Sequence, residues 1–463
     1  MAGVKNIFLI TIDALRSDRL NCYGYKKRKT TPFIDSLAEK GAKFNNCHST
    51  GPYTSPSFCS ILGGVYPLQY GYYAPFPKEG RLISEVMKEN GFFTIGVHSN
   101  PYLSELMGYR RGFDIFKDLE PRKGITFVAA NKMKNVFGWA SSFYRICAFL
   151  YYKLLMPGLK VFKGKSELLP YTRAENLKEE ALRALKKAGN NNVFFWAHFM
   201  DPHEPYSPAE KIQKKEGLSF DKTEISGINN LEVSRKRNKN MKIDDEDIRK
   251  INLFYDLELR YVDSELKEFF ESLPKRYLKN SVFIITADHG EEFLDHRSFG
   301  HAGLPYEEML HVPLIVWGDS IKRGEYDKLV STIDIPSTIL DLAGIRKPTD
   351  YRGINLFSGE RDFVVSQTQR KKGFLPSKSL TEPLNDPRHD KKDSYAVETY
   401  NDGRYKVIIS DKESKVFDLK HDPAETRNIK NSRVMEEAAC RLREEASLTE
   451  SEAIKSTVGG LDI

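Results

Sequence analysis

Residues 281–318 read SVFIITADHGEEFLDHRSFGHAGLPYEEMLHVPLIVWG, and this stretch decides the fold. It begins with a short apolar run, Val282 to Thr286, which is typical of a buried strand. Asp288 and His289 follow at the carboxyl end of that strand, the edge where open α/β sheets keep their binding sites. His301 comes after a further loop. Carboxylate oxygen and imidazole nitrogen bind divalent metals, so the stretch predicts a metal site; the alternative is a capping Asp beside a surface His.

Other predicted strands also end in polar side chains. Asp13 follows the apolar run 6–12, and Asp201 and His203 follow the strand-like run 191–196. Asn100 comes just after a predicted strand at residues 92–98, which makes it a candidate pocket residue. The carboxyl ends of parallel strands share one edge of a sheet, so we expect these residues to converge with those of residues 281–318.

The loop GPYTSPSFCSILGG, residues 51–64, offers a hydroxyl that could carry a phosphoryl group. Pro52 and Pro56 stiffen the backbone around Thr54, and a helix after Pro56 would point its amino end at the Thr54 hydroxyl. The alternative is that Thr54 and Ser55 only cap that helix.

Composition limits the class of protein. The 463 residues predict one large domain and a smaller one. The 71 basic and 64 acidic residues are scattered, which does not indicate nucleic-acid binding. Five cysteines without CxxC spacing favour unpaired thiols in a reducing compartment. The first apolar run is too short for a signal peptide or a membrane span, so we expect a cytoplasmic protein.

The order of predicted elements gives an α/β fold with two units. Helices and buried strands alternate over residues 1–355, which predicts a large doubly wound sheet flanked by helices. Residues 356–463 predict a small antiparallel sheet and a closing helix. Two insertions interrupt the first unit. Residues 211–250 are charged and predict a solvated, mobile segment. Residues 127–170 are apolar and basic, and predict a lid, a core-docked helical insertion or a segment that touches a membrane surface.

Several motifs together resemble the sulfatase branch of the alkaline phosphatase superfamily. They are IDALRSDRLNCYGY (12–25), TPFIDSLAEKGAKFNNCHS (31–49), TSPSFCSILGG (54–64), HFMDPHEPY (198–206), ADHGEEF (287–293) and KVFDLKHDPAETRNI (415–429). The resemblance implies a mixed sheet with a small carboxy-terminal antiparallel sheet. It also implies in-line attack on a sulfate or phosphate ester by a loop nucleophile that a divalent cation holds.

This sequence departs from the sulfatase pattern at the nucleophile. In that family the loop reads C/S-x-P-x-R, and the Cys or Ser is converted to formylglycine; here Thr54 and Phe58 stand at the first and last positions. A Thr cannot be converted to that aldehyde. The paired aspartates of the family are Asp13 and Ala14 here, which removes one oxygen ligand. The Thr instead resembles the phosphoethanolamine and glycerophosphate transferases of the superfamily, in which a Thr is transiently phosphorylated.

This second resemblance also implies roles for the other residues. Asp13, Thr54, Asp288 and His289 would bind the metal, and this mixed ligand set suits zinc or manganese better than calcium. In the transferases the residues that match His203 and His301 bind a second metal or the phosphoryl oxygens. A second ion would use Asp201, His203 and His301, unless Asp201 only orients its loop.

The leading hypothesis is therefore a metal-dependent hydrolase or transferase of phosphate monoesters or diesters that acts through phosphothreonine. Thr54, His203 and His301 would be catalytic, and Asn100, His203 and His301 would contact a small molecule, lipid head group or glycan. A sulfuric ester hydrolase without formylglycine is one alternative, and a non-catalytic relic that binds anions is another.

Overall fold

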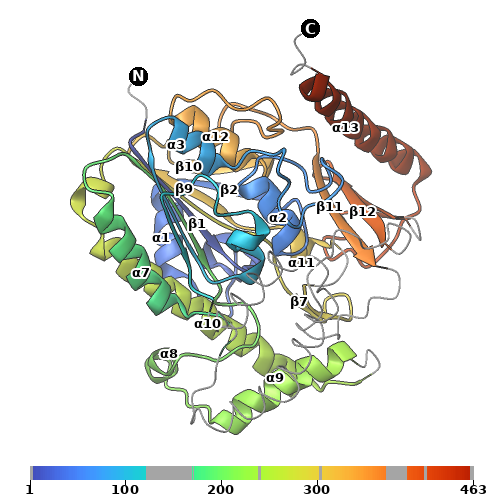
Figure 1. Cartoon of the computed structure of the whole chain (residues 1–463). Coiled ribbons are helices and arrows are strands. Elements are labelled where there is room, and N and C mark those ends of the chain that lie inside the picture. The colour runs from blue at the N-terminus through green and yellow to red at the C-terminus, as the bar shows by residue number, and fades with distance from the viewer. Residues whose placement is uncertain are drawn as a thin grey trace, which may run out of the picture.

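The structure is a computed structural model that describes residues 4–120, 169, 171–237, 241–301, 305–371, 394–410 and 414–458. An eight-stranded mixed sheet runs through the middle of the molecule (Figure 1). Its strands, in spatial order, are β10 (Gly324–Ser331), β2 (Ala42–His48), β9 (Leu314–Gly318), β6 (Ser281–Ala287), β1 (Asn6–Ile12), β5 (Val193–Phe199), β3 (Phe93–His98) and β4 (Ile115–Asp118). Strand β9 is antiparallel to both of its neighbours, and the other pairs are parallel.

Strand β1 lies at the centre, between β5 and β6, and all seven of its residues are buried. Its composition explains this position, because an unbroken apolar run suits a parallel strand that is covered on both faces. The register pairs Ile12 with Phe199 of β5 and with Ala287 of β6. As a result Asp13 and Asp288, the residues that follow β1 and β6, leave the sheet side by side.

Helices cover both faces of the sheet (Figure 1). One group, α1 (Pro32–Lys40), α7 (Ala174–Lys187) and α10 (Asp245–Ser272), packs together, and α2 (Thr54–Ile61) packs on α12 (Asp334–Leu342). The shorter helices are α3 (Ile83–Glu89), α8 (Glu210–Lys215) and α11 (Glu307–Leu310), and α9 (Lys222–Arg237) lies against α10. A two-stranded hairpin, β7 (Glu292–Phe293) and β8 (Phe299–Gly300), follows the end of β6.

The carboxy-terminal part forms the predicted antiparallel sheet. Its order is β11 (Val364–Lys371), β12 (Ser394–Asn401), β13 (Tyr405–Ser410) and β14 (Ser414–Asp418), and helix α13 (Ser432–Val458) follows. The large mixed sheet and this small sheet confirm the predicted fold class.

The charged insertion contains helices. The described part of residues 211–250 includes most of α8, all of α9 and the start of α10, and many of its side chains are exposed. Ile212, Ile225 and Ile228 are buried, and these few apolar side chains are enough to fix the amphipathic helices on the domain. Apart from Leu169, the apolar insertion at 127–170 lies outside the described residues. The three interpretations of this insertion therefore stay predictions.

The described residues contain no helix that is both long and apolar enough to cross a membrane. Cys22, Cys47, Cys59 and Cys440, the cysteines in the described ranges, are free thiols, in agreement with the absence of a predicted disulfide framework.

Candidate active site

Two buried carboxylates form the base of the site, and each is held through only one of its oxygens. Oδ2 of Asp13 accepts hydrogen bonds from Nδ2 of Asn100 at 2.9 Å and contacts Nε2 of His198 at 3.0 Å. Oδ1 of Asp288 accepts from the backbone N–H groups of Ala14 at 3.2 Å and His289 at 2.9 Å. The second oxygens, Oδ1 of Asp13 and Oδ2 of Asp288, have no hydrogen-bond partner among the described residues.

His289 is oriented so that one ring nitrogen faces these two oxygens. Its Nδ1 lies 2.8 Å from the carbonyl oxygen of Gly290, and this hydrogen bond requires that Nδ1 carries the proton. Nε2 therefore presents its lone pair 3.5 Å from Oδ1 of Asp13 and 3.4 Å from Oδ2 of Asp288. This is the tautomer in which a histidine can bind a metal through Nε2.

The hydroxyl of Thr54 completes this group of atoms. Thr54 is the first residue of α2, and its Oγ1 lies 3.5 Å from Nε2 of His289. The residue before it, Tyr53, occupies the capping position without a side-chain hydrogen bond, so Thr54 does not serve as the cap. Asn100 donates from Nδ2 both to Oγ1 of Thr54, at 3.3 Å, and to Asp13. Asn100 thus ties the hydroxyl to the carboxylate.

The loop before Thr54 is fixed from both sides. Oγ of Ser49 bonds to the carbonyl oxygen of Asp288 at 2.5 Å, which attaches the loop to the end of β6. Oγ of Ser57, in the first turn of α2, bonds to the carbonyl oxygen of Gly51 at 2.9 Å. Thr50 donates to Oγ of Ser60 at 2.7 Å. These hydroxyls explain why this Ser- and Thr-rich sequence folds into a defined turn that delivers Thr54.

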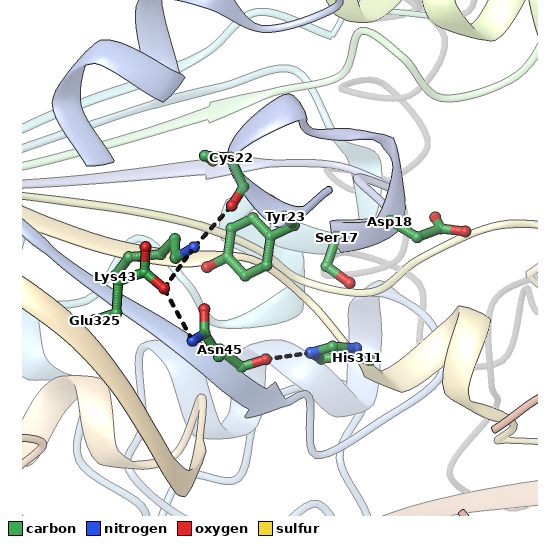
Figure 2. A pocket seen from close by; sticks show the side chains of 8 residues that line it. All are labelled: Ser17, Asp18, Cys22, Tyr23, Lys43, Asn45, His311 and Glu325. Atoms are coloured by element: carbon green, nitrogen blue, oxygen red, sulfur yellow. Dashed lines mark hydrogen bonds and ion pairs between the residues drawn. The ribbon is translucent and has the colours of Figure 1, made fainter. Parts of the chain in front are cut away.

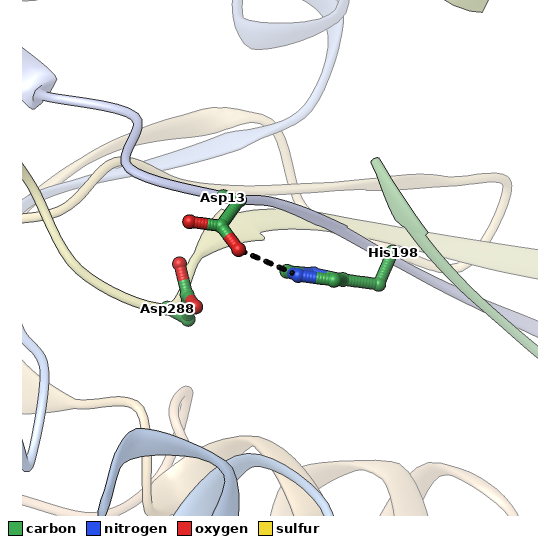
Figure 3. Close-up of side chains that lie close together, drawn as sticks. All are labelled: Asp13, His198 and Asp288. Atoms are coloured by element: carbon green, nitrogen blue, oxygen red, sulfur yellow. Dashed lines mark hydrogen bonds and ion pairs between the residues drawn. The ribbon is translucent and has the colours of Figure 1, made fainter. Parts of the chain in front are cut away.

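His198 belongs to the same cluster, although the sequence pattern assigns this strand-end histidine no role in the predicted metal site. It lies near the end of β5, and one ligand atom each from Asp13, His198 and Asp288 fall within 4.8 Å of one another (Figure 3). Nδ1 of His198 contacts Oγ1 of Thr11 at 2.9 Å. The ring of Phe58, where the sulfatase pattern has Arg, packs edge-on against His198 at 5.0 Å between centroids.

The donor types fit a divalent cation, and Asp13, His198 and Asp288 are the described residues whose ligand atoms all lie within 4.8 Å of one another. Ligands held about 2.0–2.2 Å from a tetrahedral zinc ion lie about 3.3–3.6 Å apart. Nε2 of His289 lies 3.4–3.5 Å from Oγ1 of Thr54, Oδ1 of Asp13 and Oδ2 of Asp288. Two carboxylate oxygens without hydrogen-bond donors in the described chain, both fully buried, are the donors that such an ion needs.

The charges of the site act strongly on its acids. Burial works to raise the pKa of Asp13, but His203, His198 and His289 outweigh it and hold that pKa well below its usual range. The pKa of Asp288 is raised by burial and then by the nearby charge of Asp13. The two carboxylates thus repel each other, and a cation between them would relieve that repulsion.

His203 and His301 lie next to this cluster. The ring of His301 is 4.7 Å, between centroids, from the rings of both His289 and His203. Nδ1 of His301 lies 3.2 Å from Oε1 of Glu291, a buried residue that sequence reasoning did not select. Burial lowers the pKa of His301, but Glu291 outweighs it and raises the pKa to about 9.

Asp201, a predicted ligand of a second metal, has protein partners in this structure. It pairs with Nε of Arg173 at 2.9 Å and accepts from the backbone N–H of Ala174 at 2.9 Å. Asp201 thus pairs with the partly buried Arg173, which is compatible with the alternative from the sequence that Asp201 orients the loop of His203. Of the three ligands predicted for a second ion, only the imidazoles of His203 and His301 would then be available.

A surface hollow of about 260 Å³ contains none of these residues (Figure 2). In it, Nζ of Lys43 bonds to the carbonyl oxygen of Cys22 at 2.7 Å and pairs with Glu325 at 3.2 Å. His311 contacts the carbonyl oxygen of Asn45 at 2.7 Å. The polar groups of the hollow thus bond to one another, and it adds no residue to the candidate site.

Carboxylates, imidazoles and a hydroxyl thus gather at the strand ends of a mixed sheet. Residues 5–345 match the family described as Sulfatase, and residues 294–452 match the family described as N-sulphoglucosamine sulphohydrolase, C-terminal. The chain belongs to the sulfatase family.

Relatives span most of the chain. An arylsulfatase of Clostridium perfringens is 26% identical over 485 residues, which covers 95% of this chain and 92% of the relative. Arylsulfatase K of Rattus norvegicus is 31% identical over 381 residues, 77% of this chain and 62% of the relative.

Solved structures share the fold. A putative sulfatase from Bacteroides thetaiotaomicron superimposes with a TM-score of 0.67 at 19% identity and covers 98% of this chain and 94% of its own. A phosphonate monoester hydrolase of Agrobacterium radiobacter gives 0.65 at 18% identity, with 97% of this chain and 95% of its own covered. The same fold thus carries names from both sulfate and phosphorus chemistry.

Proposed function

We propose that this chain hydrolyses phosphate esters and that the oxygen of Thr54 attacks the phosphorus. The observation that carries the proposal is the position of the Thr54 hydroxyl, 3.5 Å from the lone pair of His289 and tied to Asp13 through Asn100. An unmodified Thr can accept a phosphoryl group and release it when water attacks the phosphorus. A formylglycine mechanism is closed to it.

Asp13, Asp288, His289 and Thr54 would hold the cation. A divalent ion there supplies positive charge that lowers the pKa of the hydroxyl and offsets the charge of the transferring group. The spacing of 3.4–3.5 Å and the mixed oxygen and nitrogen donors favour zinc or manganese over calcium, which takes six to eight oxygens at longer range. The described residues support one such site.

The chain's own residues then divide the work. Asn100 fixes the Thr54 hydroxyl through Nδ2, and the amino end of α2 points backbone N–H groups at an anion. His203 and His301 would contact the ester oxygens and supply the proton to the leaving alcohol. When the Thr54–phosphorus bond forms, the phosphorus–oxygen bond of the ester breaks; water then breaks the Thr54–phosphorus bond and releases phosphate.

A sulfate ester is the second candidate substrate. Relatives named arylsulfatase favour it, and the comparisons taken alone support it better than a phosphate ester. One solved neighbour is described in complex with D-glucosamine-2-N,6-O-disulfate, so a sulfated glycan is the corresponding substrate class. The Thr at position 54 weighs against this candidate. Formylglycine can release its sulfate by elimination, whereas a sulfated Thr would have to wait for water to attack the sulfur.

Turnover of paired substrates tests the proposal. We expect the protein loaded with zinc or manganese to hydrolyse para-nitrophenyl phosphate or its diester faster than para-nitrophenyl sulfate. Thr54→Ala should lower kcat by about a thousandfold or more, and Thr54→Ser should keep much of it. Ser55→Ala, which removes the neighbouring hydroxyl, is the matched control and should retain activity. Acid quenching followed by mass spectrometry should place a phosphoryl group on Thr54.

Two outcomes would contradict this function. Sulfate turnover that survives Thr54→Ala would assign the chemistry to another group. Reactivation by calcium alone after chelation would overturn the proposed metal. Addition of glycerol separates hydrolase from transferase, because only a transferase would convert it to glycerol phosphate at the expense of free phosphate.

A further inference from the structure

Glu291 is a buried carboxylate that the proposed reaction does not use. It lies two residues after His289 and is fully buried. Its backbone carbonyl accepts a hydrogen bond from Nη1 of Arg16 at 2.9 Å, which fixes its place in the chain. Oε1 lies 3.2 Å from Nδ1 of His301, and Oε2 has no hydrogen-bond partner within the described ranges. The side chain of Glu291 thus has His301 as its bonded partner.

His301 is the middle ring of three. The centroids of His289 and His203 each lie 4.7 Å from it. His203 is oriented differently, because its Nδ1 contacts the carbonyl oxygen of the neighbouring Glu204 at 2.5 Å. In both imidazoles an acceptor occupies Nδ1, which places the proton there and leaves Nε2 for the site. Of His203 and His301, only His301 has a buried carboxylate at Nδ1.

A buried carboxylate is costly unless a partner compensates it, so its place behind His301 needs a reason. A carboxylate on one imidazole nitrogen fixes both the tautomer and the rotation of the ring, as partners of metal-bound and catalytic histidines do. His301 directly follows β8, and 22% of its side chain is exposed. Without such a partner its ring could turn away from the site.

We propose that Glu291 is a positioning residue that holds His301 with Nδ1 protonated and Nε2 directed at the ester oxygens. This inference rests on the proposed function only for the identity of the oxygens that Nε2 meets. Glu291 acts through His301, and it touches neither the nucleophile nor the cation ligands with its carboxylate.

A double-mutant cycle tests this role. Glu291→Ala should lower kcat on para-nitrophenyl phosphate about 10- to 100-fold and change KM little. In the His301→Ala background the same substitution should have no further effect, because its partner is gone. If Glu291→Ala fails to fold, Glu291→Gln preserves the volume and should also lose its effect in that background. Effects that multiply would overturn the proposal.

Glu292→Ala is the matched control. Glu292 is the neighbouring buried acid, and its Oε1 accepts from the backbone N–H groups of His296 and Ser298 instead of contacting His301. Its effect on kcat should multiply with that of His301→Ala. Thermal unfolding of each variant separates a loss of fold from a loss of rate.

Ring-nitrogen NMR of histidine-labelled protein gives a readout that does not need turnover. Recorded above pH 9, where the His301 ring is neutral, the His301 signals, identified by their loss in His301→Ala, should show a protonated Nδ1 in the wild type and a changed tautomer balance in Glu291→Ala. Unchanged signals would overturn the proposal even if the enzyme turns over esters. A wild type with this signature but no ester turnover would instead contradict the proposed function and leave the positioning role standing.

Discussion

His198 shows how a single residue can shape the proposed metal centre. It contacts Oδ2 of Asp13 and so leaves Oδ1 of that carboxylate for a cation. Thr11 lies on its other nitrogen and Phe58 on its ring edge. Where the sulfatase pattern has a second Asp and an Arg, this chain has Ala14 and Phe58. The carboxylate of Asp13 therefore has a buried imidazole beside it, in a site that lacks the two charged residues of the sulfatase pattern.

We expect His198→Ala to weaken zinc or manganese binding about 10- to 100-fold, because loss of the partner of Asp13 frees that carboxylate to rotate. Competition with a chromophoric chelator measures the affinity directly. His311→Ala removes a histidine from the surface hollow and should leave affinity unchanged. Equal affinities for wild type and His198→Ala would show that Asp13 is held by Asn100 alone.

The proposed metal ligands could be predicted from the sequence, but the residues that hold these ligands in place could not. Asp13 and Asp288 each follow an apolar run, and the rule that strand ends share an edge was enough to bring them together. The sequence places His198 at a strand end but does not show that it lies beside Asp13, and the register with Thr11 of β1 does. Glu291 looked like one acid among several, because its partner His301 is brought back to it by the hairpin of β7 and β8.

At the scale of elements, helix α1 begins without a cap of its own. Thr31 precedes it without a capping hydrogen bond, and the backbone N–H groups of Phe33 and Ile34 donate to Asp263 of α10 at 2.9–3.1 Å. A carboxylate from a neighbouring helix thus satisfies the helix end and ties α1 to α10. Burial raises the pKa of Asp263 to about 7, against the lowering effect of these N–H donors.

This arrangement predicts a pH dependence of stability. The folded protein keeps the Asp263 proton up to about pH 7, whereas the unfolded chain releases it near its ordinary value of about 3.9. Asp263 therefore adds stability that is full below pH 4 and is lost as the pH rises toward 7, by up to about 1.4 kcal/mol per pH unit.

Asp263→Asn keeps an acceptor oxygen and does not titrate, which makes it the variant to compare. We expect the difference in unfolding free energy, wild type minus variant, to fall as the pH rises from 5 to 7.5. Denaturant titrations at several pH values measure it. A difference that stays constant over this range would mean that Asp263 is already ionised in the folded protein.

Elements with strong periodicity were predictable, and elements defined by their neighbours were not. The apolar runs of β1, β5 and β6 indicate central strands, and the predicted fold class follows from these strands. Strand β10 alternates partly buried and exposed residues over Gly324 to Lys328, so its sequence resembles a polar segment, and only the pairing with β2 shows it to be a strand. Helix α9 has few apolar residues, and contact with α10 decides its place. Edge position and helix docking are tertiary effects that local composition does not carry.

At the scale of the whole molecule, the carboxy-terminal sheet reaches the loop that delivers Thr54. The backbone N–H of Gln367 in β11 donates to the carbonyl oxygen of Thr50 at 2.8 Å, and Oγ of Ser366 bonds to that of Ser49 at 2.5 Å. A boundary near residue 355 remains our proposal for the two units. Such a boundary would place β11 in one unit and the Thr54 loop, to which β11 is hydrogen-bonded, in the other.

A buried ion cluster holds the two parts together. Nζ of Lys406, on β13, pairs with Glu307 of α11 and with Glu425 at 2.9 Å each, and Lys406 is fully buried. Glu307 also contacts Nε2 of His48, the last residue of β2, at 3.0 Å. The cluster therefore joins the small sheet to the strand that leads into the Thr54 loop. Loss of one charge would leave the others buried without compensation.

We expect Lys406→Met to destabilise the protein by about 3–5 kcal/mol, because two buried carboxylates lose their cation. Activity should fall in step as the small sheet loosens from the loop that carries Thr54. A second substitution, Glu425→Gln, should recover part of the stability in the Lys406→Met background, since it removes one of the uncompensated acids. Lys420→Met, which removes an exposed lysine after β14, is the control and should change little. Denaturant unfolding measured together with ester turnover checks both effects, and a Lys406→Met protein as stable as wild type would show that the two sheets are held by apolar contacts alone.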